Sequence, residues 1–320
     1  VKMPTTIGYG NGYQISYMNS GKMTNKGWEF RVDAVPFQNK DWRVGVYFNI
    51  AHNENKITEM PDNYIEENYT FGNGNYAYRR EEGRPMGSFY GYRYKGVYQN
   101  KDATYARDIE GNVMKDISGN AIVMRNGSYT VAPGDAIYED VNHDGVINQY
   151  DIVYLGNSNP RLTGGAGLNV SYKQFKLSAI FYGRYGQDVV NATRLNNESM
   201  RGIDNQSTAV LRRWRNEGDQ TDIPRALYGE GYNTLGSDRF VEDASYLRLK
   251  SLSFTYRLPK KAIQRWGFNN IDVYVTGYNL FTWTNYTGQD PEVKTENTYA
   301  KDTATTPASI QLVAGFNLSF

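Results

Sequence analysis

The sequence predicts an all-β protein, specifically a portion of an antiparallel transmembrane β-barrel with about seven strands and long loops on one side. Three observations predict it. Apolar and polar residues alternate with period two in several long segments, as in strands with one wet and one dry face. The composition is rich in residues that suit such strands, with 28 Tyr and 32 Gly among 320 residues. Short and long connections alternate between these segments, as they do in a barrel but have no reason to do in a β-sandwich.

The expected strands follow in order. Gly27 to Phe37 alternates apolar residues with Glu29, Arg31 and Asp33, and after a short polar turn Trp42 to Ile50 continues the same pattern, which predicts a hairpin. Five further segments alternate: Thr163–Tyr172, Phe175–Gly186, Tyr246–Leu258, Ile271–Leu280 and Ile310–Phe320. The alternation changes phase at Ser251, which predicts a β-bulge there.

These strands set the expected domain organisation. Residues 1–320 form one unit of barrel wall, with extracellular loops at 1–26, 54–162 and 187–245 and with the short turns on the periplasmic side. The last strand then runs down to a periplasmic carboxy terminus. Seven strands are too few to close a barrel, so the sequence is expected to be incomplete at its amino end, where a signal peptide is also absent.

Composition excludes several other classes of protein. No apolar run approaches the roughly 18 residues of a spanning helix, and the mean hydropathy is −0.67. The chain has no Cys and two His, which argues against a disulfide scaffold, a thiolate zinc site or a Ser/His/Asp triad. A net charge of +1 without a basic cluster argues against nucleic-acid binding. The acidic pairs Glu81-Glu82 and Asp290/Glu292 are expected to be solvated, so we expect no enzyme.

One loop has readable metal chemistry. Residues Asp140 to Asp151 read DVNHDGVINQYD and match the spacing of a calcium-binding loop, with Gly145 at the sharp turn. The expected ligands are Asp140, Asn142, Asp144, the carbonyl of Val146, Asn148 and Asp151. The twelfth position is Asp rather than Glu, and the flanks are not two obvious helices. The alternative is an Asn/Asp/Gly-rich turn that only shapes the loop.

Other candidate residues follow from the expected faces. Inward charges would line a wet lumen: Glu29, Arg31, Asp33, Arg43, Lys176, Arg184, Arg248 and Lys250. Contact with a substrate and a solvated wall with mutual ion pairs explain these charges equally well. Aromatic residues in loops are candidates for stacking on a substrate, although packing between loops explains them equally well: Tyr90, Tyr92, Tyr98, Trp283 and Tyr286.

Four groups of motifs carry a family resemblance. They are Asn25-Lys26-Gly27-Trp28-Glu29; Gly87-Ser88-Phe89-Tyr90-Gly91-Tyr92 with Lys95-Gly96-Val97-Tyr98; the Asp140–Asn148 loop with Leu155–Arg161; and Tyr246–Lys250 with Asn279–Thr284 and Asp290–Val293. Their order and spacing, with the terminal Phe, resemble the carboxy-terminal part of SusC/RagA-type TonB-dependent outer-membrane transporters across nearly the whole chain.

The resemblance implies a barrel of about 22 strands around a plug. It also implies active import of oligosaccharides, or of peptides, together with a SusD-like surface lipoprotein and the TonB complex. The plug domain and the TonB box are absent from this sequence. By the same resemblance the protein lies in outer-membrane lipid, and Phe316, Leu318 and Phe320 form its assembly signal. The alternative reading is a secreted, calcium-stiffened β-sandwich that binds glycans and buries the apolar stripes in a core.

Overall fold

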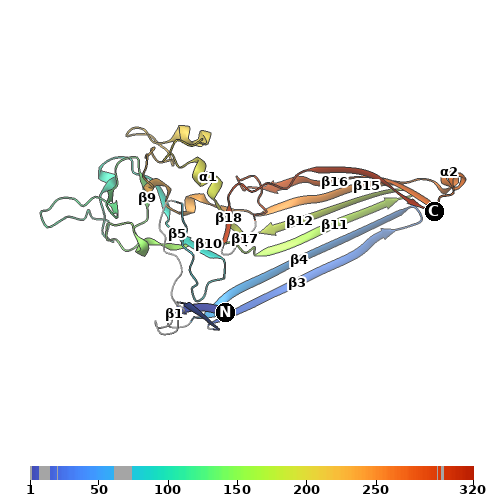
Figure 1. Cartoon of the computed structure of the whole chain (residues 1–320), viewed down its shortest axis with the longest axis horizontal. Coiled ribbons are helices and arrows are strands. Elements are labelled where there is room, and N and C mark those ends of the chain that lie inside the picture. Colours follow the sequence, from blue (N-terminus) through green and yellow to red (C-terminus); the bar gives the residue numbers. More distant parts are fainter. Residues whose placement is uncertain (1, 7–14, 20, 61–73, 294, 297–298) are drawn as a thin grey trace.

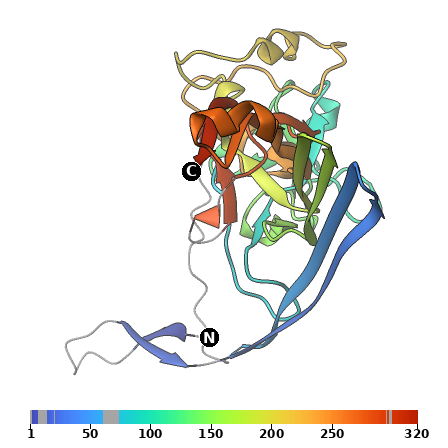
Figure 2. The same cartoon turned by 90° about the vertical axis from the view of Figure 1, so that its right-hand side faces the viewer.

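The computed structural model describes residues 2–6, 15–19, 21–60, 74–293, 295–296 and 299–320. A long, twisted sheet occupies one half of the molecule, and most of the remaining chain forms an assembly of loops at one end of that sheet (Figure 1). Viewed along its strands, the sheet is curved (Figure 2). Within the described part of the chain, no helix has the length and apolar character needed to cross a membrane.

Seven antiparallel strands form the main sheet, in the order β19-β16-β15-β12-β11-β4-β3. Their bounds are β3 (Lys22–Gln38), β4 (Trp42–Glu59), β11 (Leu162–Tyr172), β12 (Phe175–Tyr185), β15 (Tyr246–Arg257), β16 (Asn270–Thr284) and β19 (Gln311–Ser319). The short turns lie at one end of the sheet and the long connections at the other, where the loop assembly sits (Figure 1). The predicted fold class and the number of strands are confirmed.

The first hairpin is longer than predicted. Strand β3 begins at Lys22 and β4 ends at Glu59, so residues 22–26 and 54–59 are strand rather than loop. Pairing extends this far because a returning loop segment takes the place of a neighbouring strand: the Ile57 N–H donates to the Arg84 carbonyl at 2.9 Å. The loop predictions for residues 1, 7–14, 20 and 61–73 lie outside the described residues.

The apolar residues of all seven strands are in register on one face. One cross-strand row joins Val46, Leu168, Ala179 and Leu252 through successive paired positions. The predicted bulge lies at Lys250, because Phe181 pairs with Leu249 while the preceding residue of β12 pairs with Ser251. The extra residue returns Leu249 to the same face as Leu252, so the bulge keeps the apolar stripe continuous.

This apolar face is uncovered. Phe30, Phe254 and Leu312 on it are 54%, 48% and 75% exposed, and no second sheet packs on it within the described residues. Such a face suits lipid, and the alternative β-sandwich is therefore wrong. At the turn end the aromatic rings of Trp42 and Tyr172 lie 4.3 Å apart, centroid to centroid, as expected of an aromatic girdle at a membrane interface.

The opposite face is polar and its residues pair across strands. Asn169 accepts a hydrogen bond from Ser178 at 2.8 Å, and Arg257 forms an ion pair with Asp272 at 2.7 Å. Gly167 lies opposite Tyr47 in the ladder, and a Cβ atom on this glycine would stand 1.8 Å from the tyrosine ring. The glycine therefore lets the ring lie flat across the neighbouring strand.

The loops carry short elements. The strands of the loop assembly are β5 (Ser88–Gly91), β6 (Tyr94–Val97), β7 (Arg125–Asn126), β8 (Tyr129–Thr130), β9 (Ala136–Tyr138), β10 (Val153–Asn157), β13 (Asp188–Asn191), β14 (Val241–Asp243), β17 (Thr295–Glu296) and β18 (Tyr299–Asp302). The helix α1 (Ala192–Asn197) belongs to the same assembly, whereas α2 (Lys260–Ile263) lies at the turn end, and β1 (Lys2–Thr6) pairs with β2 (Ile15–Asn19). The main hydrophobic clusters of buried side chains lie in the loops rather than in the barrel wall.

Candidate functional site

The loop assembly is held together by a core of tyrosines, which favours packing over substrate stacking, the two alternatives left open by the sequence. Tyr90, Tyr92 and Tyr98 are 0%, 3% and 3% exposed, and they pack in one cluster with Tyr138. Burial raises the pKa of Tyr98 to about 12, although its hydrogen bond with Tyr232 acts to lower it. These residues were candidates for stacking on a substrate, but rings this deeply packed have no free face. They stiffen the loops instead.

The other two aromatic candidates also lie elsewhere than expected. Tyr286 is 6% exposed and donates a hydrogen bond from its hydroxyl to Asp302 at 2.6 Å. Trp283 is 52% exposed, but its side chain belongs to the apolar face, because Trp283 pairs with Leu247 in the ladder. Neither residue is therefore placed to contact a substrate on the polar face.

An ionic cluster fastens the segment after β16 to the polar face. Arg248 of β15 is 2% exposed, and its guanidinium binds both Asp290 and Glu292, the latter at 2.8 Å. Lys250 reaches the same Glu292 carboxylate at 2.9 Å. The sequence predicts that Asp290 and Glu292 are a solvated acidic pair. In the structure they are instead the partners of two inward cations.

The environment of Asp290 explains the strength of this fastening. Burial acts to raise the pKa of Asp290, but the N–H groups of Ala308 and Glu292 and the charge of Arg248 outweigh burial and lower the pKa. The carboxylate is therefore stabilised in its charged form. The cations of β15 and the later acidic motif are both visible in the sequence. The period of the strands does not indicate that these two groups of residues come into contact.

The Asp140–Asp151 loop folds as its spacing predicts in several respects. Gly145 has a φ of +79°, the left-handed conformation that the sharp turn requires. The Asp140 carboxylate accepts hydrogen bonds from the N–H groups of Asp144 and Gly145, at 3.2 and 2.8 Å. Ile147 is fully buried in the tyrosine cluster. The loop is therefore closed on itself and anchored to the core.

The predicted ligands fit a cation only in part. Asn142 and Asn148 both point toward the Asp144 carboxylate, with Nδ2 to Oδ2 distances of 2.9 and 3.5 Å. The Asn148 oxygen is occupied, since it accepts the Tyr150 N–H at 2.8 Å. Among the described residues, no group of three or more His, Asp or Glu side chains is arranged to hold a metal ion by itself. A cation here needs amide and carbonyl oxygens as well as carboxylates.

Among the predicted ligands, Asp151 differs most from its predicted role. This carboxylate is fully buried, and its two oxygens accept the N–H groups of Val141 and Asn148, each at 2.8 Å. Burial raises the pKa of Asp151, the N–H donors oppose that rise, and the charges of Asp140 and Asp144 add to it. Asp151 thus ties the two ends of the loop together, and Asp140, Asn142, Asp144 and the Val146 carbonyl remain as the better ligands.

A pocket lined by amides lies where the polar face meets the loops. Its volume is about 410 Å³, and Asn25, Asn53, Asn55 and Asn159 line it without any charged residue. Asn55 joins both sides of the pocket, since it donates to Asn25 at 2.7 Å and accepts the Met86 N–H at 2.8 Å. Neutral amides both donate and accept hydrogen bonds. This pocket was not predicted from the sequence, although Asn53 and Asn55 continue the inward phase of the predicted strand Trp42–Ile50.

The geometry defines a class of protein: a curved portion of transmembrane β-barrel wall, polar inside and apolar outside, with a packed loop assembly at one end. Comparisons with known proteins agree. TonB-dependent receptor P3 of Formosa agariphila is 32% identical over 294 residues, which are 90% of this chain and 27% of that protein. TonB-dependent receptor SusC of Bacteroides thetaiotaomicron is 27% identical over 311 residues, 94% of this chain and 27% of SusC.

Solved structures give the same answer. The structure of the RagAB peptide transporter aligns with a TM-score of 0.73 and 26% identity, covering 99% of this chain and 31% of that one. No family model matches the chain. The sequence and the fold of this chain are therefore similar to those of TonB-dependent receptors, SusC among them, and to that of the RagAB peptide transporter. The chain spans only about a third or less of the length of these relatives.

Proposed function

We propose that the protein containing this chain imports nutrients across the outer membrane in a TonB-dependent manner, with a SusD-like surface lipoprotein as its partner. The observation that carries the proposal is the junction of a polar inner wall with a packed loop assembly, where the amide pocket opens. Relatives named as receptors and as a peptide transporter support import rather than catalysis. In this arrangement the long connections between β4 and β11 and between β12 and β15 are extracellular, and the carboxy terminus is periplasmic.

The proposed substrate is an oligosaccharide, with a peptide as the alternative. Uncharged amides suit sugar hydroxyls and peptide groups alike, because both ligands offer donors and acceptors without net charge. Energy for this import would come from the TonB complex. The proposed role of Phe316, Leu318 and Phe320 is recognition during outer-membrane assembly, since all three side chains are exposed on the apolar face.

An uptake assay tests this function. Cells that express the complete receptor and its lipoprotein are given fluorescent oligosaccharides or fluorescent peptides of matched size. We expect accumulation of one of the two ligands, loss of accumulation when the proton-motive force is collapsed, and lower accumulation when Asn53 and Asn55 are both replaced by Ala. Uptake that persists without the proton-motive force would contradict TonB-dependent import. The lipoprotein should also co-purify with the tagged receptor from solubilised outer membranes.

We further infer that the Asp140–Asp151 loop binds Ca²⁺, with a structural role. Asp140, Asn142, Asp144 and the Val146 carbonyl would hold the ion, and Asn148 would contribute through a water, as is common at that position. Ca²⁺ would offset the repulsion between Asp140 and Asp144 and so rigidify the loop above the tyrosine core.

Terbium luminescence tests the calcium proposal on the complete receptor. We expect Tb³⁺ bound in the loop to be sensitised by Tyr150, a 68% exposed residue of the same loop, and to be displaced by Ca²⁺. Asp144→Asn should weaken binding by about tenfold or more, because a ligand charge is lost. Asp116→Asn, in a similar exposed turn outside the loop, is the control. Equal luminescence in the protein and in Asp144→Asn would exclude this site.

A further inference from the structure

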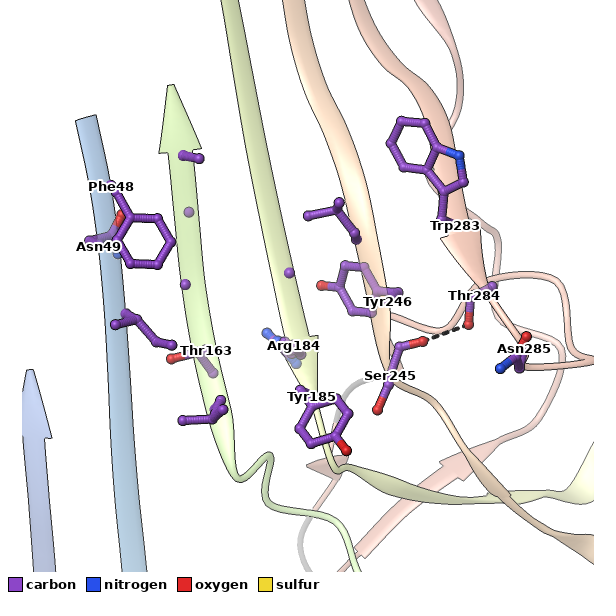
Figure 3. A pocket seen from close by; sticks show the side chains of 17 residues that line it. Phe48, Asn49, Thr163, Arg184, Tyr185, Ser245, Tyr246, Trp283, Thr284 and Asn285 are labelled. Atoms are coloured by element: carbon purple, nitrogen blue, oxygen red, sulfur yellow. Dashed lines mark hydrogen bonds between the residues drawn. The ribbon is translucent and has the colours of Figure 1, made fainter. Parts of the chain in front are cut away.

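A second pocket opens on the apolar face of the sheet, near its loop end. Its volume is about 570 Å³, within the range of about 300–1,000 Å³ that is usual for small-molecule sites. Phe48 and Trp283 stand on opposite sides of it (Figure 3). Gly164 and Ala166 on β11 and Gly183 on β12 also line it, and these two strands lie between β4 and β16 in the sheet. We refer to this pocket as the wall groove.

The ladder explains why the wall is hollow at this level. Successive pairs join Ile50, Gly164, Gly183, Leu247 and Trp283 in one row across five strands. The two neighbouring glycines in the middle of the row leave the sheet without side chains between Ile50 and Leu247. The next row toward the turn end has Ala166 between Phe48 and Phe181, so it is shallow as well.

The wall groove does not result from an open sheet edge. It is formed by β4, β11, β12, β15 and β16, all of which are inner strands of the seven-stranded sheet. At the level of the groove the glycine-bearing strands β11 and β12 are paired on both sides, and β16 is paired with β15. Further strands of a complete barrel would join the sheet at β3 and β19, away from the groove. The hollow is therefore a property of the finished wall.

Polarity changes along the groove. Toward the middle of the strands its walls are Phe48, Leu247 and Trp283, which are between 45% and 52% exposed. At the loop end it is lined by Tyr185, Ser245 and Asn285 (Figure 3). Tyr185 is 60% exposed, so its hydroxyl is accessible. A ligand that fits this groove is apolar on the side toward the turn end of the sheet and polar at the loop end.

We propose that the wall groove binds one acyl chain of a membrane lipid from the leaflet on the loop side. The groove is continuous with the apolar face that the barrel turns toward lipid, so a lipid reaches it without crossing water. The apolar part would hold the chain, and Tyr185 and Asn285 would lie at the level of the ester groups. The proposal rests on the fold of the wall and not on the transported substrate.

The variants that test the wall groove should leave its two glycines, Gly164 and Gly183, unchanged. A Cβ atom on Gly164 would stand 2.6 Å from the Asn49 carbonyl oxygen, and one on Gly183 would stand 2.8 Å from the Tyr246 carbonyl oxygen. Either change would disturb the backbone, whatever the effect on lipid. Ala166→Phe fills the groove from a position that already carries a Cβ atom, and Ala314→Phe adds the same ring elsewhere on the apolar face, opposite Val275.

The test uses the complete receptor in vesicles that contain a small fraction of phosphatidylethanolamine with brominated acyl chains, which quench nearby tryptophans. The contribution of Trp283 is isolated by comparison with Trp283→Phe. We expect quenching of Trp283 to saturate at a mole fraction of brominated lipid about tenfold lower than random lipid contact requires. Ala166→Phe should abolish this preference and Ala314→Phe should preserve it.

Native mass spectrometry of the detergent-purified receptor gives an independent measurement. One retained lipid per protein is expected, and its loss in Trp283→Ala, which removes a wall of the groove, covers the case in which Ala166→Phe fails to fold. Quenching that follows the bulk mole fraction, or a groove that retains only detergent, would overturn the proposal.

Discussion

Replacing Arg248 with Ala is expected to release the segment of residues 285–293 from the inner wall. The guanidinium is nearly inaccessible and neutralises both Asp290 and Glu292. Removing it leaves two carboxylates without their main partner, and breaking a buried pair in this way typically costs about 3–5 kcal/mol. We expect the loss of stability to stay within this segment, which also carries the buried residues Tyr286 and Val293. Hydrogen exchange of the backbone amides of residues 285–293 in the complete receptor should accelerate by about 100-fold or more.

Arg257 provides a matched control on the same strand. It also pairs with a carboxylate, Asp272, but its side chain is 60% exposed against 3% for Arg248. An exposed pair contributes about 0–1 kcal/mol, so Arg257→Ala should leave the exchange of residues 285–293 unchanged. If both variants behave alike, burial of the Arg248 cluster does not fasten the segment. A Lys at position 248 should rescue only part of the effect, since an ammonium cannot bind two carboxylates as a planar fork does.

The barrel wall was predictable from the sequence because it depends on local rules. Period two assigns a face to every residue of a strand, and the phase change beside Lys250 shows where an extra residue must be accommodated. The strand ends were less predictable: β4 continues to Glu59 because a distant loop segment pairs with Ile57. Such pairing depends on how the loop returns, which no periodic pattern records.

The candidate sites were predicted less well, and for a physical reason. Tyrosine in a loop is amphipathic, so the sequence alone does not distinguish a ring that binds a ligand from one that packs between loops, and Tyr90 proved to be packed. The amide pocket and the Arg248 cluster each join residues far apart in the chain. The Asp140–Asp151 loop was recognisable because its spacing is contiguous, yet Asp151 uses both oxygens on backbone N–H groups.

Placing an arginine at position 254 should separate the two faces of the wall most sharply. Phe254 is the ninth of the twelve residues of β15, pairs with Leu177 and Val275, and is 48% exposed on the apolar face. If that face contacts lipid, Phe254→Arg puts a charge in hydrocarbon, at a cost that falls from about 2–4 kcal/mol at the midplane of the membrane to about 0–1 kcal/mol near its interfaces. Urea unfolding of the complete receptor in lipid vesicles should shift to a correspondingly lower midpoint, and less folded protein should accumulate in outer membranes.

The adjacent residue supplies the control. Ser253 faces the polar side, where its hydroxyl contacts Thr276 at 2.8 Å. Ser253→Arg therefore adds the same side chain to a face that already holds the exposed cations Lys176 and Arg257. We expect the unfolding midpoint of this variant to remain close to that of the unchanged receptor. Neighbouring residues of a strand point to opposite faces. The two variants are therefore adjacent in the sequence, but one places the arginine on the apolar face and the other on the polar face. A larger loss for Ser253→Arg than for Phe254→Arg would mean that the assignment of the two faces is inverted.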